Sequence, residues 1–95
     1  MRLGILGTLS LALMLISQVA LAETVRIGFV TTLTGGAGAI GNDMRDAVEL
    51  ALDHLGRKMG DSDVKMFYED DTFKPAVGKQ KTEKLVKKDK VHFVT

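Results

Sequence analysis

Residues 25–43 constrain the fold of this chain most, because they read as a strand, a glycine-rich loop and the start of a helix. Residues 25–30 are apolar and rich in β-branched side chains, which is typical of a buried strand in a parallel sheet. Residues 31–41 contain four glycines, and glycine lets the backbone present N–H groups to a ligand at close range. From Asn42 onward, with Asn42 or Asp43 as the predicted N-cap, apolar residues recur at helical spacing. These residues are Met44, Ala47, Val48, Ala51, Leu52 and Leu55.

The rest of the chain repeats the alternation of strand and helix. A turn is predicted over 56–63, a strand over 64–68, a helix over 76–88 with Pro75 in its first turn, and a strand over 91–95. The sequence therefore predicts an α/β fold: the start of a doubly wound parallel sheet with right-handed crossovers and strand order 2-1-3. In such sheets ligands bind beyond the carboxyl ends of the strands, where the order reverses.

The first 22 residues are predicted to be a signal peptide. Met1-Arg2 is a positive start, residues 3–16 are almost wholly apolar, and Ala20-Leu21-Ala22 fits the small-x-small cleavage pattern. The apolar run is shorter than the roughly 20 residues of a membrane-spanning helix. We expect cleavage after Ala22, export to the periplasm and a mature domain over residues 23–95. The chain has no cysteine, which argues against a lipid anchor or a disulfide scaffold.

The charge balance gives no sign of a nucleic-acid or anionic-membrane partner. The whole chain has 13 basic and 12 acidic side chains. Loss of Arg2 with the signal peptide leaves the two kinds of charge equal, whereas nucleic-acid-binding domains carry a clear basic excess.

Residues 36–41 read G-x-G-x-x-G between a strand and a helix, which raises the possibility of a dinucleotide-binding oxidoreductase. Three features argue against it. Residues 31–35 intervene between the strand and the first glycine, Asp43 would repel a pyrophosphate at the helix start, and export removes the chain from the cytosolic cofactor pool. We expect no bound cofactor.

The other chemically capable residues are interpreted as structural. Glu69-Asp70-Asp71 could bind a hard cation, but adjacent acids point in different directions and the D-x-D-x-D-G spacing is absent. We expect one of them to cap the following helix and another to make local hydrogen bonds. His54 and His92 lack a second metal ligand at suitable spacing, and no Ser has a nucleophile context. Neither a metal site nor catalytic residues are predicted, so the chain is not expected to be an enzyme.

Several short motifs occur in a characteristic order behind the predicted signal peptide. They are Ile27-Gly28, Leu33-Thr34-Gly35, Ala39-Ile40-Gly41, Asp70-Asp71 with Pro75, Lys84-Leu85-Val86 and Val91-His92-Phe93-Val94. With these motifs the chain resembles the amino-terminal end of periplasmic substrate-binding proteins of the leucine/isoleucine/valine type, which serve ABC importers. The resemblance implies a type I periplasmic binding fold with two lobes that close around a ligand, of which this chain holds a truncated part of the first lobe.

The resemblance also implies a ligand loop and a partner. Its candidate ligand-binding residues here are Thr34, Gly35, Ile40 and Gly41. The implied ligand is an amino acid or another small carboxylate, including an aromatic acid, and the implied partners are the permease subunits of an importer. Many relatives have an aromatic residue at the position of Ile40 and a proline at that of Gly36, so the branched-chain preference cannot be copied. Lys74 also replaces a helix-capping acid.

Two alternatives to transport stay open at this point. A ligand-sensing domain of a receptor or regulator with the same fold would look identical over these residues. An exported oxidoreductase would have to bind a nicotinamide dinucleotide, which the glycine spacing argues against.

Overall fold

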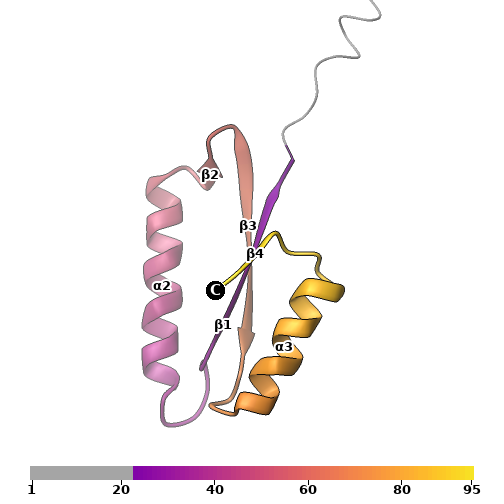
Figure 1. Ribbon diagram of the computed structural model, residues 1–95. Helices are drawn as coiled ribbons and strands as arrows, with labels where there is room; N and C mark the ends of the chain where they lie inside the picture. The colour runs from indigo at the N-terminus through magenta and orange to yellow at the C-terminus, as the bar shows by residue number, and fades with distance from the viewer. Residues whose placement is uncertain (1–22) are drawn as a thin grey trace, which may run out of the picture.

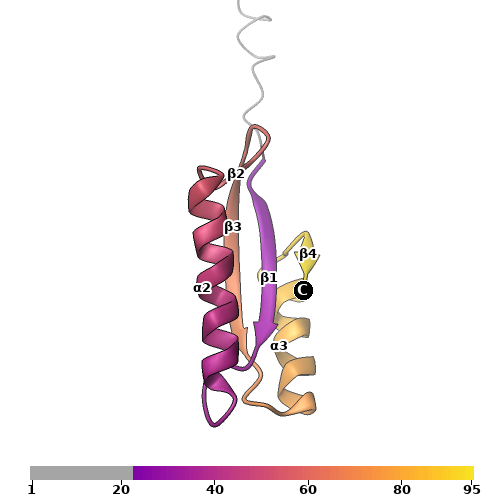
Figure 2. The same cartoon turned by 90° about the vertical axis from the view of Figure 1, so that its left-hand side faces the viewer.

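The structure is a computed structural model that describes residues 23–95, so the predicted signal peptide over residues 1–22 lies outside the described residues. In the described part, helix α2 lies against one face of a β-sheet and helix α3 against the opposite face (Figure 1, Figure 2). Strands that alternate with helices through right-handed crossovers produce this three-layer arrangement. The predicted α/β class is therefore confirmed.

The sheet is centred on β1 (Val25–Thr31). β3 (Ser62–Asp70) runs parallel to β1, with Thr31 opposite Asp70 at the carboxyl ends. β4 (Phe93–Val94) runs parallel along the other side of β1. The three parallel strands therefore have the predicted order, with the second and third on either side of the first.

Strand β2 (Lys58–Met59) departs from the prediction, which had only a turn in this region. It pairs antiparallel with the start of β3, so the sheet is mixed and its order is β2-β3-β1-β4. The chain reverses through Gly56, Arg57 and Gly60, whose φ angles are 67°, 58° and 60°. Two strand residues are too few to show a period-two pattern, so the sequence could not separate this hairpin from a turn.

Helix α2 (Gly38–His54) begins four residues earlier than Asn42, the first of the two predicted N-caps. Ala37 is the N-cap and makes no side-chain capping bond. The helix can begin among the glycines because its first turns pack directly on the preceding loop. A Cβ added to Gly38 would lie 2.8 Å from the Leu33 carbonyl oxygen, and one on Gly41 would lie 1.7 Å from that of Thr32.

Helix α3 (Pro75–Lys87) has proline in its first turn, as predicted. Its N-cap is Lys74, in an extended conformation and without a side-chain capping bond. The expectation that an acid of the 69–71 run caps this helix is therefore wrong. The carboxylates of Asp70 and Asp71 instead accept bonds from the loops that lead away from β1 and β3.

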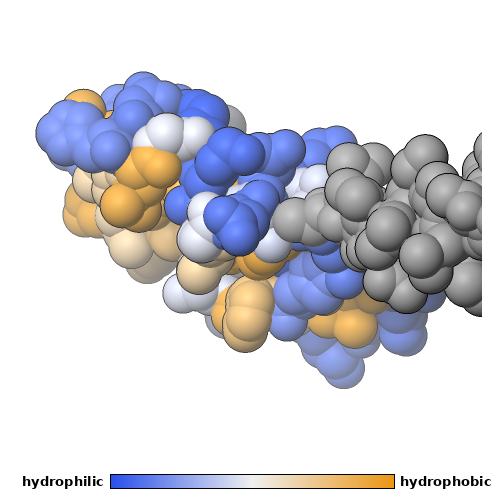
Figure 3. Space-filling model, turned by 90° about the horizontal axis from the view of Figure 1, so that it is seen from above, coloured by the Kyte–Doolittle hydropathy of each residue, from blue (hydrophilic) through white to orange (hydrophobic). Residues whose placement is uncertain are grey.

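The core of the described residues is thin. Its buried apolar side chains are Phe29, Leu52, Val64 and Leu85, and only Leu85 is fully enclosed. The predicted apolar stripe of α2 is partly covered: Leu52 is buried, whereas Met44 and Leu55 are 47% and 64% exposed. Figure 3 shows apolar patches at the surface beside the hydrophilic side chains. Few side chains of residues 23–95 are therefore shielded from water.

The third parallel strand is also shorter than the predicted 91–95, because β4 covers only Phe93 and Val94. Both side chains are exposed. Within residues 23–95, no helix combines the length and apolar character needed to cross a membrane.

Candidate functional site: the loops beyond the carboxyl ends of β1 and β3

The loops that follow β1 and β3 lie together at one edge of the sheet, at the bottom of Figure 1. They meet there because the two strands are parallel and end in register. Residues 32–37 form the first loop and lead into α2, and residues 71–74 form the second and lead into α3. This carboxyl edge is where a parallel α/β sheet places its ligand site.

Asp70, the last residue of β3, joins the two loops. Its Oδ1 accepts hydrogen bonds from the backbone N–H groups of Leu33 and Thr72, each at 2.9 Å. Its Oδ2 accepts a bond from the Thr34 hydroxyl at 2.6 Å. Donation by the Thr34 hydroxyl and by the Leu33 and Thr72 amides lowers the pKa of Asp70 to about 2, so the carboxylate is ionised at any physiological pH.

Asp71 forms a second connection, nearer the base of the loops. Its Oδ1 accepts bonds from the Thr32 hydroxyl at 2.6 Å and from the Phe73 N–H at 2.8 Å. Its backbone N–H donates to the Thr31 carbonyl at 3.0 Å. Asp71 therefore binds the first residue of the first loop, Thr32, and Asp70 binds the residues that follow it.

Glu69 points to the opposite side of the strand from Asp70 and pairs with α3. Its carboxylate contacts the ammonium groups of Lys84 and Lys81. The local bonds predicted for one acid of this run do occur at Asp70 and Asp71, but the run also connects different elements, which was not predicted. Among residues 23–95, no group of three or more His, Cys, Asp or Glu side chains is arranged to hold a metal ion.

Asn42 ties the start of α2 to the first loop. Its side-chain Nδ2 donates to the Leu33 carbonyl at 2.9 Å and to the Gly38 carbonyl at 2.7 Å. Sequence reasoning missed this role because it took Asn42 as a possible N-cap. The sequence did contain a sign that the two loops touch. The first loop carries threonine hydroxyls, which donate hydrogen bonds, and the next parallel strand ends in acids, which accept them.

The four predicted ligand-binding residues lie in different environments. Thr34 is exposed and donates to Asp70, and Gly35 is exposed with φ of 80°. Ile40 lies in the first turn of α2 with 68% of its surface exposed. Gly41 is buried against the Thr32 carbonyl, which leaves no room for a side chain. This close packing is enough to explain why position 41 is a glycine. The structure thus brings Thr34, Gly35 and Ile40 to the surface near the carboxyl edge, and the ligand role of all four stays a prediction.

A cavity of about 360 Å³ opens on the carboxyl edge beside the second loop. It is lined by Asp71, Phe73, Lys74 and Pro75. Phe73 is 77% exposed, and both Thr72 and Phe73 have positive φ, at 51° and 60°. Sequence reasoning did not single out Phe73, because a lone aromatic residue in a loop has no distinguishing pattern.

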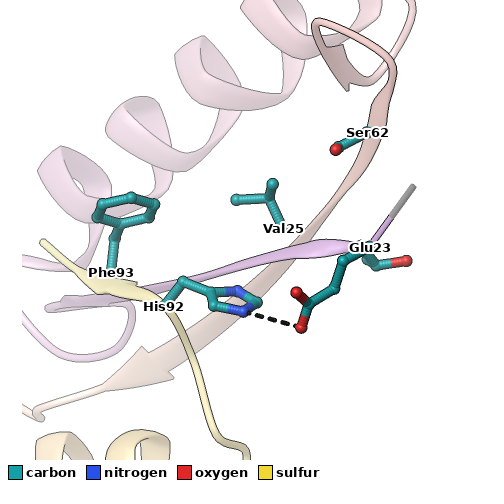
Figure 4. A pocket seen from close by; sticks show the side chains of 6 residues that line it. Glu23, Val25, Ser62, His92 and Phe93 are labelled. Atoms are coloured by element: carbon teal, nitrogen blue, oxygen red, sulfur yellow. Dashed lines mark hydrogen bonds and ion pairs between the residues drawn. The ribbon is translucent and has the colours of Figure 1, made fainter. Parts of the chain in front are cut away.

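A second cavity, of about 250 Å³, lies at the amino ends of the strands, away from the expected ligand edge (Figure 4). His92 lines it and is held on two sides. Its Nδ1 accepts the Arg26 backbone N–H at 3.0 Å, and its Nε2 lies 3.3 Å from the Glu23 carboxylate. These contacts attach the segment before β4 to the amino end of β1, and the structural role of His92 stays a prediction.

The described chain matches a known protein family over nearly its whole length. Residues 24–95 match the model of a family described as periplasmic binding protein. No curated protein matches the chain.

Two solved structures are similar to this one. An ABC transporter substrate-binding protein from Sphaerobacter thermophilus has 35% sequence identity and a TM-score of 0.73, over 76% of this chain and 19% of that chain. A solute binding protein of an ABC transporter from Rhodopseudomonas palustris BisB5, in complex with 3,4-dihydroxy benzoic acid, has 24% identity and a TM-score of 0.72, over 75% of this chain and 20% of that chain. This chain spans about a fifth of the length of either.

Proposed function

Because this chain belongs to the periplasmic binding protein family, we propose that it is the amino-terminal part of an exported solute-binding protein that captures a small ligand for an ABC importer. Members of this family bind ligands and are not enzymes. The observation that carries the proposal is the family match over residues 24–95, joined to a threonine- and glycine-rich loop at the edge where such sheets bind ligands.

The proposed ligand is a small carboxylate, either an amino acid or an aromatic acid. The resemblance to binding proteins of the leucine/isoleucine/valine type supports an amino acid. The 3,4-dihydroxy benzoic acid bound to the solute binding protein from Rhodopseudomonas palustris supports an aromatic acid. Thr34, Gly35, Ile40 and Gly41 are the proposed contribution of this segment to the ligand cleft, and the remaining contacts come from the rest of the first lobe and from a second lobe.

Calorimetry on the full-length protein tests the ligand class. We expect micromolar or tighter binding of one compound from a panel of proteinogenic amino acids and hydroxybenzoates, with no heat of binding for NAD⁺. Absence of binding across the panel would reject the proposed ligand class. Binding of NAD⁺ would instead support the oxidoreductase alternative. Sequencing the gene downstream of codon 95 separates transport from sensing, because neighbouring permease genes belong with an importer and a signalling domain belongs with a receptor.

Export to the periplasm is part of the same proposal. Its basis is the small-x-small pattern at Ala20-Leu21-Ala22. Expressed from its native start in a Gram-negative host, the protein should be recovered from the periplasmic fraction with Glu23 as its first residue. Amino-terminal sequencing that finds Met1 on a soluble cytoplasmic product would reject the processing site.

A further inference from the structure

Two side chains from outside the first loop bind its exposed part: Asn42 of α2 donates to the Leu33 carbonyl, and Asp70 of β3 accepts two hydrogen bonds from the loop. The Leu33 amide and the Thr34 hydroxyl both donate to Asp70, which lies 36 residues after Thr34 in the sequence. We propose that Asp70 is a positioning residue, which holds residues 33–36 in the shape that the ligand requires. This role rests on the proposed function, since it acts on the loop assigned to the ligand.

The loop needs such an anchor because of its composition. Gly35 and Gly36 are both exposed, and a Cβ added to either would have no neighbouring atom within 4 Å. Two adjacent glycines without packing neighbours have the greatest backbone freedom of any residue pair, so ordering them costs much conformational entropy. A loop that samples many shapes is competent for binding only part of the time, and the apparent Kd rises in inverse proportion to that fraction.

Within the first loop, Asp70 binds only the outer residues Leu33 and Thr34. The base of the loop, at Thr31 and Thr32, is held independently of Asp70. Asp71 accepts a hydrogen bond from the Thr32 hydroxyl and donates its own N–H to the Thr31 carbonyl. Removal of the Asp70 carboxylate therefore frees the Leu33 and Thr72 amides and the Thr34 hydroxyl, and it leaves the base of the first loop in place. The consequence should be a loss of loop order without separation of β1 from β3.

The anchor is also permanent over the pH range in which the protein functions. The three donors lower the pKa of Asp70 to about 2, so the carboxylate keeps its charge and its acceptor capacity at neutral pH. Hydrogen bonds to a charged acceptor are stronger than those between neutral groups. The geometry thus favours fixed positioning of the loop over a pH-dependent switch.

The test uses the full-length protein and the variants Asp70→Ala, Asp70→Asn and Glu69→Ala. Glu69→Ala is the matched control, because it removes the adjacent carboxylate, which pairs with α3 and has no bond to the first loop. Two quantities are measured for each: the Kd for 3,4-dihydroxybenzoate and for L-leucine by calorimetry, and amide hydrogen exchange without ligand. The exchange readout compares the Leu33 amide with the Asp71 amide, which stays bonded to Thr31.

For Asp70→Ala we expect a Kd about tenfold higher and exchange at the Leu33 amide about tenfold faster, with little change at the Asp71 amide. Asp70→Asn should stay within about threefold of the wild type, because its Oδ1 can still accept both backbone N–H groups. Glu69→Ala should lower the melting temperature and leave the Kd unchanged.

Two results would overturn the positioning role. One is an unchanged Kd and unchanged exchange at Leu33 in Asp70→Ala. The other is an equal rise in Kd for Glu69→Ala, which would show that general destabilisation is sufficient. Wild-type protein that binds neither probe nor any compound of the panel would reject the proposed function instead, and exchange at Leu33 would then decide alone whether Asp70 orders the loop.

Discussion

The phenolic hydroxyl of Tyr68 donates a hydrogen bond to Glu49 at 2.7 Å, and this bond joins the sheet to α2. The same carboxylate pairs with the Arg57 guanidinium, which also bonds to Asp53. Burial and the bond to Glu49 raise the pKa of Tyr68, and the bonds from Arg57 and then Tyr68 lower the pKa of Glu49. The ring of Tyr68 packs edge-on against Phe29, with 6.0 Å between the ring centroids.

Tyr68→Phe in the full-length protein should therefore destabilise the fold by about 2 kcal/mol, within the range of one hydrogen bond to a charged group. The ring contact with Phe29 remains in this variant, and Glu49 keeps its bond to Arg57. Urea unfolding measures the change, and Asp43→Asn, at an exposed position of α2, serves as the control. Equal unfolding midpoints for wild type and Tyr68→Phe would contradict a stabilising role for this bond.

The stability contributed by Asp70 should disappear in acid. Its pKa is about 2 in the folded protein against an ordinary 3.8. Because folding lowers this pKa, the ionised carboxylate stabilises the fold fully above about pH 4, and the contribution is lost as the pH falls toward 2. The difference in urea midpoint between wild type and Asp70→Asn should accordingly be largest near neutral pH and shrink over that acidic range. A difference that does not vary with pH would show that Asp70 does not stabilise the fold through its charge.

Gly41→Ala should destabilise the full-length protein by about 3 kcal/mol or more, since the added methyl group would lie 1.7 Å from the Thr32 carbonyl oxygen. The contacting oxygen belongs to the backbone of Thr32, and backbone cannot move away as a flexible side chain can. Gly36→Ala is the matched control in the same glycine-rich stretch, because its added methyl group meets no atom within 4 Å. Thermal unfolding of both variants checks the prediction, and similar melting temperatures would disprove the close approach of α2 to the loop.

Ile40→Trp should change ligand affinity by about tenfold or more, whereas His54→Ala should change it less than about twofold. Ile40 is exposed in the first turn of α2, and His54 is the last residue of the same helix. The two lie about 20 Å apart along the helix axis, given a rise of about 1.5 Å per residue. Calorimetry on the full-length protein with its best ligand makes the comparison. Equal and negligible effects of the two substitutions on affinity would show that the ligand does not bind near the start of α2.

Residues 23–95 expressed alone should neither fold cooperatively nor bind ligand. Leu85 is the one fully buried apolar side chain of the described residues, and Phe93 and Val94 of β4 remain exposed at 60% and 41%. A chain of this size is marginally stable, and with four buried apolar side chains among the described residues its burial does not offset its conformational entropy. An uncovered edge strand also promotes association. Thermal melting followed by circular dichroism should show a broad transition, and sedimentation should show aggregates. A sharp transition from a monomer, with micromolar affinity for an amino acid or aromatic acid, would refute this expectation.

The order of elements could be predicted because β1 is a run of apolar and β-branched residues, α2 has a clear helical period, and Pro75 marks the start of α3. The alternation of strand and helix, the parallel pairing and the strand order around β1 all agree with the structure. The start of α2 could not be placed, because glycine is a poor helix former and reads as loop. Gly38 and Gly41 belong to the helix because of tertiary packing on the Leu33 and Thr32 carbonyls, and local propensity carries no information about such a contact.

The carboxyl edge was predictable as a location but not in its bonding. One acid of residues 69–71 was expected to cap α3 and another to bond locally. Asp70 and Asp71 do accept local bonds from Thr72 and Phe73, but they also bond across to Thr34 and Thr32 on the neighbouring loop. The partner of a carboxylate depends on the register between β1 and β3, which places Thr31 opposite Asp70. A single sequence shows that two strands exist, but it does not show which of their residues lie opposite each other.

Gly28 in β1 lies directly beneath Leu85 of α3, where an added Cβ would come within 2.8 Å of the leucine side chain. The helix can approach the sheet closely because one partner has no side chain and the other is large. The two positions therefore share a single volume. In a family alignment we expect them to covary, with a larger residue at position 28 accompanied by a smaller one at position 85.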